Sequence, residues 1–549
     1  MAQKFDGEAT GAVAQGVEIR RMGPTETSYY LGARGEGIEG GVNDMYLHIG
    51  FRARPGVVTR DRVLQAWSAV LKAHPLLCST AEFCDYDDIR FRSSGEVTGT
   101  GLHARTSELC KFESGRRADT IIAEHLNGPR TLSDSKLSSL VVSSPDAGWD
   151  WQSEAGRDAA PAAEMRDFDF FLLSTHFLGD GMALHSTANE FFRLLSRPTA
   201  GGGDEYEIGT CDSLPPPMED RLMTSSQQRP LGRAIARVDF EREQAKLVGG
   251  HAFPRARLGV RRTLVPTVSY PSTETKRILA ACKAHGVSIA HAMFALANVA
   301  FIRSTPAERR QPELPVMLYS ALNVRPYLRA DPESDWYHIA IGYYNIVLPT
   351  FLCAKASDAE TFWHRARRVK QQTAAVVTSP FLGSRTLSMA QKRESLSIGL
   401  ERAADEKKRA TEHVQELVKL EVGADGANGA NGAAEQEGSR VDGKKDDSSE
   451  PVAASPSTAK TPQTVLMGLS MLGNLDGMYH RSEYAGVELQ SLTTGSRQRP
   501  GALLLFAYTF ADKLWLSLGY DVNGFEAGVV ERWWTELQRG VAEFLLSGP

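Results

Sequence analysis

The segment from Asp167 to Leu195 constrains the fold most, because strand periodicity changes to helical periodicity within it. Residues 168–173 form a nearly continuous apolar run of the length of a buried strand. Further on, apolar side chains recur at helical spacing: Leu184, Ala188, Phe191 and Leu195. The sequence therefore predicts a buried strand that turns directly into an amphipathic helix.

The turn between strand and helix reads His176-Phe-Leu-Gly-Asp180-Gly181. A neutral imidazole is well suited near pH 7 to take a proton from a hydroxyl, thiol or amine, so His176 is a candidate general base. A buried Asp180 would be costly unless paired, so we expect a cationic partner elsewhere in the chain. The glycines beside Asp180 are expected to give the backbone angles that other residues avoid. The alternative is structural, with His176 as a hydrogen-bonded core residue and Asp180 as a helix cap.

These residues resemble the HxxxDG signature of the CoA-dependent acyltransferase superfamily, which includes peptide-synthetase condensation domains and fungal trichothecene O-acetyltransferases. The resemblance implies an α/β fold with two lobes like those of chloramphenicol acetyltransferase. Each lobe would have a mixed sheet flanked by helices, and the active-site tunnel would run between the lobes. The resemblance also implies that His176 is the catalytic base, that Asp180 helps to aim it, and that Gly181 supports the turn.

Three further residues follow from the same resemblance. Arg325, at the end of a predicted strand over residues 314–322, matches the arginine that pairs with the signature aspartate in the family. Ser470, in Ser-Met-Leu-Gly, resembles a serine of the dihydrolipoyl acyltransferases and is a candidate oxyanion donor. A serine satisfied within its own sheet is the alternative. Asn345 matches a Gly-Tyr-x-x-Asn element that is one residue shorter here, and it is a candidate supporting residue.

Other motifs are absent or incomplete. Residues 35–40 match GxGxxG, but the strand-like run over residues 42–51 follows where a dinucleotide fingerprint requires a helix. The chain has no GxSxG elbow and no phosphate-binding loop, so we expect the two substrates to react directly. His74, in a His-Pro-Leu-Leu sequence that ends a predicted helix, is expected to be structural. The six cysteines form no CxxC pair, which argues against a metal site and is compatible with a reducing compartment.

The composition is that of an ordinary globular protein, with 42% apolar and 23% charged residues. A net charge of -5 gives no hint of a nucleic-acid partner. No apolar run reaches the ~18 residues of a membrane span, and the first residues lack the apolar core of a signal peptide. We therefore expect a cytoplasmic protein. We also expect a monomer, because two lobes in one chain already build the interface where the catalytic groups meet.

With 549 residues, the chain is long enough for two or more domains. We expect a disordered tail over residues 1–18, an N-terminal lobe over 19–205, a crossover over 206–260 and a C-terminal lobe over 261–549. Within the last lobe, residues 423–462 are rich in Gly, Ala, Asn, Lys and Asp, which cannot bury a core. They are expected to be a disordered insertion.

The predicted function is that of an acyl-CoA-dependent O-acyltransferase, with acetyl-CoA as the preferred co-substrate and no resident cofactor. The whole pattern, including residues 22–26 and 42–46, is most similar to the fungal trichothecene 15-O-acetyltransferase branch and its glycolipid-acylating relatives. The acceptor would therefore be a small-molecule alcohol, either a sesquiterpenoid or a mannosylerythritol-type glycolipid. Two alternatives remain. One is a condensation-type synthase that uses a carrier-protein thioester, and the other is a non-catalytic relative that binds a metabolite or a protein through the tunnel.

Overall fold

The computed structural model describes residues 17–35, 37–93, 100–152, 164–197, 213–222, 229–329, 337–352, 355–425 and 462–547. Most of the predicted tail and of the predicted insertion lies outside these residues. The chain forms two compact units, of which the first comprises residues 1–398 and 463–549 and the second residues 399–462. The described residues of the second unit up to Asp425 belong to one long helix, α11 (Leu382–Asp425).

A mixed five-stranded sheet forms the N-terminal lobe, with the strand order β13-β2-β7-β6-β5. In that order the strands are Val487–Ser496, Met45–Ala53, Arg166–Ser174, Ser138–Ser144 and Cys110–Ser114. The helices of this lobe are α1 (Pro24–Ala33), α2 (Arg60–Ala73), α3 (Thr100–Leu109), α4 (Ala118–Asn127) and α5 (Gly181–Leu195). A small sheet joins β1 (Glu18–Arg21), β4 (Asp88–Ser93) and β3 (Thr80–Asp85).

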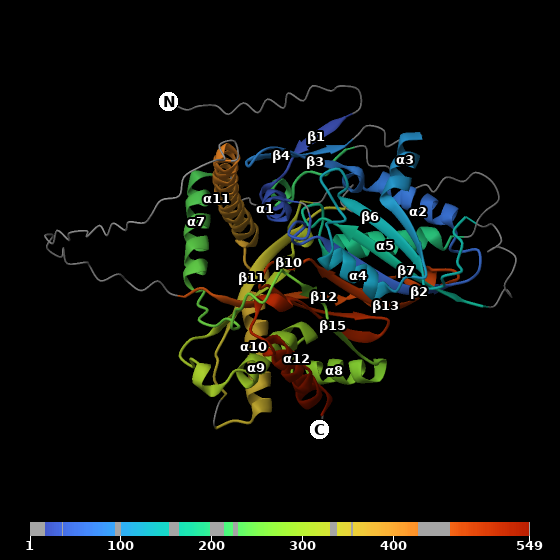
Figure 1. The fold of residues 1–549 in the computed structure, drawn as a ribbon. Coiled ribbons are helices and arrows are strands. Elements are labelled where there is room, and N and C mark those ends of the chain that lie inside the picture. The colour runs from blue at the N-terminus through green and yellow to red at the C-terminus, as the bar shows by residue number, and fades with distance from the viewer. Residues whose placement is uncertain are drawn as a thin grey trace, which may run out of the picture. The chain divides into compact units, whose positions relative to one another are not determined.

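Strand β7 is the predicted apolar strand, and it lies at the centre of its sheet. Phe168, Phe170 and Leu172 pack into the core cluster that includes residues of α2 and α5. Phe171 and Leu173 point to the other face and pack with residues of α4. The apolar run is therefore continuous because both faces of β7 are covered, as Figure 1 shows.

Strand β13 belongs to the N-terminal sheet although it lies late in the chain. It pairs with β2 in antiparallel register, from Val487 opposite Ala53 to Ser496 opposite Met45. Residues 487–496 therefore leave the C-terminal part of the chain and complete the other sheet. Because β14 follows directly after this excursion, the two lobes are joined by backbone hydrogen bonds as well as by side-chain packing.

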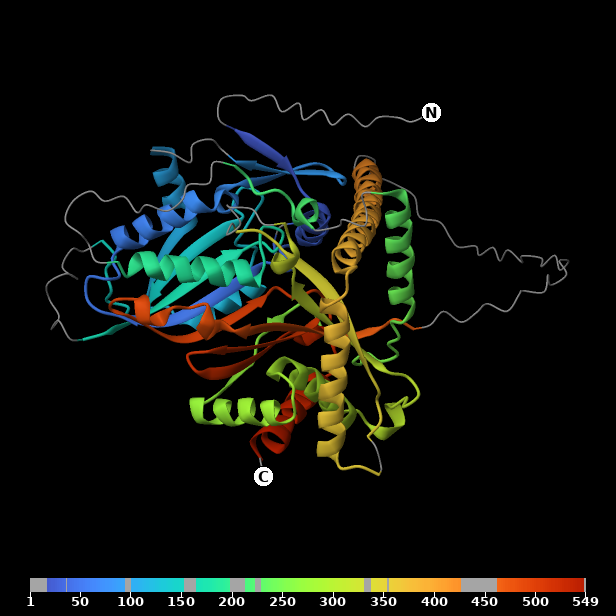
Figure 2. The same cartoon turned by 180° about the vertical axis from the view of Figure 1, so that it is seen from behind.

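A second mixed sheet forms the C-terminal lobe, with the order β11-β10-β12-β14-β15-β8 and with β9 also paired to β15. Along the chain the strands are β8 (Thr263–Leu264), β9 (Thr267–Tyr270), β10 (Val316–Asn323), β11 (Ile341–Leu348), β12 (Val465–Asn474), β14 (Leu503–Phe510) and β15 (Lys513–Asp521). Its helices are α8 (Ser272–Ala284), α9 (Ile289–Ser304), α10 (Asp358–Val377) and α12 (Val529–Gly540). These helices lie together on one side of the sheet (Figures 1 and 2).

Side chains cap the starts of several helices. Thr59, Ser288 and Ser357 cap α2, α9 and α10, and the last two form capping boxes. Helix α8 begins at Ser272, after Pro271, without a side-chain cap. The last helix, α12, begins at Val529, and residues 522–524 before it form a short 3-10 turn.

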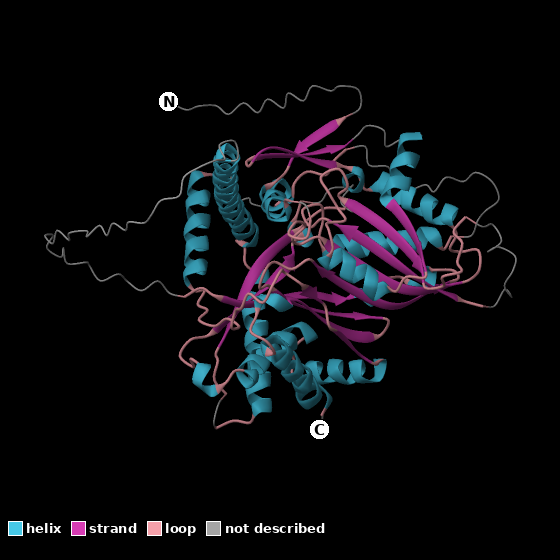
Figure 3. Ribbon diagram, in the orientation of Figure 1, coloured by secondary structure: helices cyan, strands magenta, loops and turns pink. Residues whose placement is uncertain are grey.

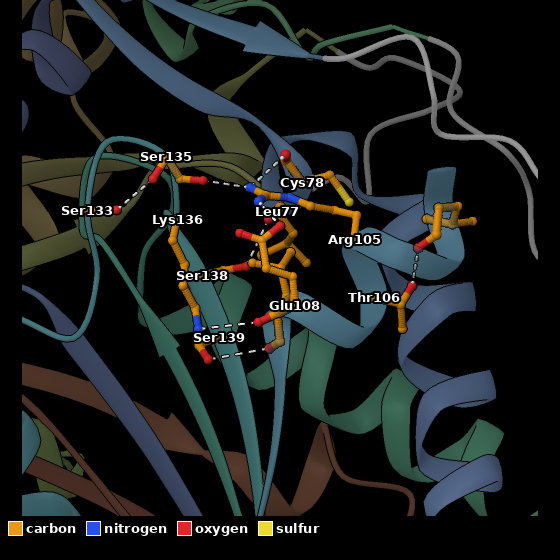
Figure 4. A network of polar contacts seen from close by, with 12 residues as sticks. Leu77, Cys78, Arg105, Thr106, Glu108, Ser133, Ser135, Lys136, Ser138 and Ser139 are labelled. Carbon is orange, nitrogen blue, oxygen red and sulfur yellow. Dashed lines mark hydrogen bonds and ion pairs between the residues drawn. The ribbon is translucent and has the colours of Figure 1, made fainter. Parts of the chain in front are cut away.

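Polar contacts fix the first residues of β6 against the end of α3 and the turn after α2 (Figure 4). The guanidinium of Arg105 donates to the carbonyl of Cys78 at 3.2 Å and to that of Ser135 at 2.8 Å. The hydroxyl of Ser138 donates to Leu77 O at 2.8 Å, and that of Ser139 to Leu109 O at 3.3 Å. These contacts tie the start of β6 to α3 and to the turn after α2, while the backbone ladder pairs β6 with β7.

The architecture is thus a mixed α/β fold of two lobes, each with a sheet flanked by helices, as predicted (Figure 3). Two helices, the short α6 (Met218–Arg221) and the longer α7 (Pro230–Ala245), lie in the stretch of chain between the lobes. Within the described ranges, no single helix is long and apolar enough to cross a bilayer. Helices α8 and α9 pass such a test only when taken together, across a bend of 90°.

Candidate active site

The turn from His176 to Asp180 lies where β7 ends and α5 begins. Asp180 is the N-cap of α5, and its Oδ1 accepts a hydrogen bond of 3.0 Å from the N–H of Ala183. The helix cap that the structural alternative assigned to Asp180 is therefore present. It does not exclude a functional role, because it leaves the imidazole of His176 directed towards a cavity.

His176 has a defined tautomer. Its Nδ1 lies 3.0 Å from the carbonyl oxygen of Gly179, and a carbonyl can only accept, so Nδ1 carries the proton. The lone pair is then on Nε2. Burial lowers the pKa of His176, while the nearby Asp180 acts in the opposite direction. The ring is partly exposed to the cavity and is neutral near pH 7, which is the state that a general base requires.

Asp180 has the cationic partner expected from the sequence. Nη1 of Arg325 lies 3.0 Å from its Oδ1 and 2.8 Å from its Oδ2, and the N–H of Ala340 donates to Oδ2 at 2.7 Å. Burial alone would raise the pKa of Asp180, but the Arg325 guanidinium and the backbone N–H groups hold that pKa below its usual value. Asp180 is therefore ionised and fully paired. It does not point at a reacting atom but fixes the turn.

Arg325 extends this network to the segment before β11. Its Nη2 donates to the carbonyl of His338 at 2.6 Å, while Nη1 holds Asp180. One guanidinium thus joins the turn of the N-terminal lobe to two segments of the C-terminal lobe. The planar, five-donor geometry of arginine allows this, whereas a lysine could not make the same set of contacts.

The two glycines beside Asp180 have a different purpose from the one expected. Neither Gly179 nor Gly181 has a positive φ, so neither is needed for its backbone angles. At Gly179, an added Cβ would lie only 2.7 Å from Cζ of the Tyr337 ring. At Gly181 it would meet only Cδ2 of Leu472, at 3.2 Å. The first glycine is required for a close approach, and the second leaves space at the cavity.

A cavity of about 150 Å³ lies at this turn, and His176, Asp180, Gly181 and Ser470 all line it. Its other walls come from α1, β2 and α5 and from strands β10 to β14, of which β13 belongs to the N-terminal sheet. The imidazole is therefore not enclosed by packed side chains on all sides. The cavity brings together the candidate base, the candidate oxyanion donor and the ion pair's carboxylate.

Ser470 lies on β12, opposite Phe506 of β14, and is half-buried at the cavity wall. Asn345 is less directly placed. It lies on β11 opposite Tyr319, and the cavity lining includes Tyr343, two residues earlier, but not Asn345. The Gly-Tyr-Tyr-Asn element therefore contributes a tyrosine to the cavity.

Sequence reasoning missed three tyrosines of the cavity lining: Tyr29, Tyr319 and Tyr343. For Tyr319 and Tyr343 a signal existed, because β10 and β11 alternate and residues two apart share a face. No such signal existed for Tyr29. Eight of the ten residues of α1 are buried, and its apolar residues do not mark one face of the helix.

His74 is structural, as expected. It ends α2, its Nε2 lies 2.8 Å from Oε2 of Glu190, and its Nδ1 accepts from the N–H of Tyr337 at 3.1 Å. Both ring nitrogens are therefore occupied by partners within the fold. His74 helps to hold Tyr337, the residue that packs on Gly179.

A second, larger cavity of about 670 Å³ lies in the C-terminal lobe. It is bounded by the turn between α8 and α9 and by the ends of β12 and β14. Met471, at an irregularity in the pairing of these strands, lines both cavities. Among the residues that the structure describes, no group of three or more His, Cys, Asp or Glu side chains is placed to hold a metal ion.

Neither a protein-family model nor a curated protein sequence matches the chain. Solved structures do match the chain in fold. Trichothecene 15-O-acetyltransferase TRI3 from Fusarium sporotrichioides is 12% identical with a TM-score of 0.69, over 97% of this chain and 95% of that one. The condensation domain of the Monacolin K polyketide synthase MokA is 11% identical with a TM-score of 0.55, over 97% and 99%. The epimerization domain from the third module of tyrocidine synthetase B is 12% identical with a TM-score of 0.57, over 97% and 98%.

The chain therefore has the two-lobed fold of these solved structures, as the resemblance of its HxxxDG residues implied. The likeness is one of fold, shared with an acetyltransferase and with condensation domains.

Proposed function

We propose that this protein is an acyl-CoA-dependent O-acyltransferase that acylates a hydroxyl group of a small molecule. The observation that carries the proposal is the state of His176: Nδ1 is bound to the Gly179 carbonyl, so the basic Nε2 is left for a substrate in the cavity. His74, whose two ring nitrogens both have partners within the fold, does not line this cavity.

The reaction needs no covalent enzyme intermediate. Nε2 of His176 takes the proton of the acceptor hydroxyl while that oxygen attacks the thioester carbonyl carbon. The hydroxyl of Ser470 donates to the oxyanion of the tetrahedral intermediate. As the intermediate collapses, the C–S bond breaks, and the thiolate takes the proton from the imidazolium. General base catalysis is worth ~10²–10⁴-fold, and one oxyanion donor ~10²–10³-fold.

The larger cavity supports a route for the thioester arm. It adjoins the catalytic cavity at Met471, it is lined by many apolar groups of α8, β12 and β14, and Lys283 lies at its rim. An apolar passage suits a pantetheine arm and its acyl group, and a lysine suits a phosphate. Acetyl is the preferred acyl group because an acetyltransferase shares the fold over nearly its whole length.

The acceptor is proposed to be a secondary-metabolite alcohol, either a sesquiterpenoid or a mannosylerythritol-type glycolipid. Support for the first comes from the 15-O-acetyltransferase of trichothecenes, which has the same fold along nearly its whole length. A second candidate function, condensation with a carrier-protein thioester, is favoured by the condensation domains that share the fold. The two differ in the donor and not in the chemistry at His176.

The test is an assay of thiol release with a panel of acyl-CoA donors, from acetyl to about twelve carbons, against a metabolite extract. Mass spectrometry of the products identifies donor and acceptor together. His176→Ala should lower the rate by ~10²–10⁴-fold, and Ser470→Ala by ~10²–10³-fold. Transfer from an acylated carrier protein, with none from acyl-CoA, would establish the condensation reaction instead. Folded protein that transfers from neither donor would overturn the proposal.

We also propose that the protein acts as a monomer in the cytoplasm. The catalytic residues and the second cavity all come from one chain. Light scattering of the purified protein should therefore give the mass of one chain at the concentrations used for assay.

A further inference from the structure

The ring of Tyr29, on α1, lies against His176. The two ring centroids are 4.3 Å apart, and the ring planes differ by 24°, so the phenol and the imidazole are stacked. Tyr29 is nearly buried, and both residues line the catalytic cavity. One hydrogen bond from Nδ1 leaves an imidazole free to tilt about that bond. A stacked ring removes this freedom, because it supports the face of the imidazole along its whole width.

Tyr29 is itself held from two other elements. Its hydroxyl is hydrogen-bonded to the hydroxyl of Tyr343 on β11. The guanidinium of Arg393, on α11, lies 4.1 Å from the centroid of the Tyr343 ring and 5.7 Å from that of Tyr29. Segments from three separate parts of the chain thus converge behind the imidazole.

On its α11 side this cluster has little room to rearrange. Between the two tyrosines and α11 lies a cavity of only about 10 Å³, lined by Tyr29, Tyr343 and Arg393 among others. Such a volume holds about one water molecule. Because close-packed side chains cannot shift without displacing their neighbours, the position of Tyr29 is set by α11 and β11 together.

This inference rests on the proposed function. We propose that Tyr29 is a positioning residue for His176: its ring holds the imidazole with Nε2 directed into the cavity, and Tyr343 and Arg393 hold Tyr29. None of the three needs to touch a substrate. They act through the imidazole, and they form a support that the HxxxDG residues do not supply.

The charges around His176 agree with this arrangement. Burial lowers the pKa of His176 most. Asp180, itself paired with Arg325, raises that pKa, and Arg393 lowers it from behind Tyr29. Burial also keeps Tyr29 neutral, because it raises the pKa of that phenol well above its usual value. Burial likewise raises the pKa of Tyr319. Arg393 is thus the group on the α11 side that opposes protonation of the base.

The first experiment compares Tyr29→Leu, which removes the ring, with Tyr29→Phe, which keeps it. We expect Tyr29→Leu to lower kcat by ~10²-fold, the loss that follows a displacement of about 1 Å, with KM changed less than ~3-fold. Tyr29→Phe should rescue most of that loss. Tyr30→Leu is the matched control. Tyr30 is the next residue of α1, equally buried, and it packs on Phe177 and Phe83 rather than on His176. Tyr30→Leu should lower the free energy of unfolding and leave kcat unchanged below the melting temperature.

A second measurement does not depend on turnover. Nitrogen-15 NMR of histidine-labelled full-length protein reports the tautomer and the pKa of His176, with the signal assigned by its loss in His176→Gln. We expect Tyr29→Leu to mix the two tautomers and Arg393→Met to raise the pKa of His176. In the pH–rate profile, Arg393→Met should move the acidic limb to higher pH.

The outcomes separate the two proposals. If no acyl transfer is found but the tautomer and pKa change as stated, the proposed function fails and the support of His176 by Tyr29 stands. If Tyr29→Leu keeps the wild-type tautomer and pKa, the inference is wrong, whatever the activity. It is also wrong if Tyr29→Phe loses as much kcat as Tyr29→Leu, because the hydroxyl and not the ring would then matter. Should Tyr29→Leu not fold, Arg393→Met supplies the test: the inference is wrong if neither the tautomer nor the pKa of His176 changes in that variant.

Discussion

Arg325 and Asp180 are 145 positions apart in the chain, yet Nη1 of the arginine lies within 3.0 Å of both carboxylate oxygens. The aspartate side chain is 6% exposed and the arginine side chain 25%. Because both side chains are largely enclosed, the surrounding protein fixes the geometry of the ion pair. It joins the turn that carries His176 to the other lobe, so the orientation of the candidate base depends on contacts between the lobes.

Removing the charge of Asp180 should therefore destabilise the fold. In Asp180→Asn the amide keeps the size of the side chain but leaves the Arg325 guanidinium buried without a counter-ion. We expect a loss of about 3 kcal/mol in the free energy of unfolding, at the lower end of values for buried pairs because Arg325 is partly exposed. Urea denaturation measures it. Asp239→Asn is the control, because Asp239 is 20% exposed and its partner Arg385 keeps Glu243 at 3.6 Å as a second counter-ion, so the loss should be at most about 1 kcal/mol. Equal losses in the two variants would contradict the prediction.

The same pair should make stability depend on pH in the acidic range. The pKa of Asp180 is lowered in the folded state, so the folded protein binds this proton less tightly than the unfolded chain does. The stabilisation is fully present above the unfolded pKa, about 3.9, and is lost as the pH falls through the folded value. The difference in unfolding free energy between wild type and Asp180→Asn should thus be constant from pH 7 to about 5 and shrink below pH 4. A difference that stays constant down to pH 3 would show that Asp180 is not the titrating group.

The two glycines of the turn should respond differently to alanine. Gly179→Ala places a methyl group against the ring of Tyr337, which is buried and held by His74, so it should destabilise by about 1–3 kcal/mol. At Gly181 the added methyl group would meet only the end of the Leu472 side chain, and the φ of Gly181 is not positive. It should change stability by less than about 0.5 kcal/mol. Thermal unfolding of the two variants measures this difference in stability. The double variant Gly179→Ala with Tyr337→Leu should recover part of the stability lost in Gly179→Ala.

Arg497 should be essential for the end of α4. It is fully buried, its Nε donates to Leu126 O at 3.2 Å, and its Nη2 donates to the carbonyl of Gly128. Burial lowers its pKa to about 10, so it remains a cation at neutral pH. Arg497→Met leaves these carbonyls with fewer donors and should cost about 1–3 kcal/mol.

Hydrogen exchange of the amides of α4 should also become faster in Arg497→Met. The control is Arg499→Met, two residues further on, which alters an exposed side chain and should stay within about 0.5 kcal/mol of wild type. If the exchange rates of α4 do not change, the carbonyls have found other donors and the assigned role is wrong.

Local sequence patterns determined the elements around the site. The apolar run of β7, the spacing of α5 and the caps at Thr59, Ser288 and Ser357 act over a few residues, so they could be identified without coordinates. The same patterns indicated the fold, because a strand that ends in HxxxDG and opens a helix is specific enough to suggest the superfamily. The need of a buried Asp180 for a cation followed from the cost of an unpaired charge, although the match to Arg325 came from the family resemblance.

Only the tertiary structure decided what surrounds His176. That Tyr29 stacks on the imidazole, that β13 joins the other sheet, and that Gly179 is required by Tyr337 all depend on residues more than a hundred positions apart. Even where the sequence marked the correct element, as at Gly342 to Asn345, it did not show that Tyr343 rather than Asn345 lines the cavity. The physical reason is that hydrophobic periodicity, caps and turns are short-range effects, whereas close packing between lobes is set by the shapes of surfaces that meet only after both have folded.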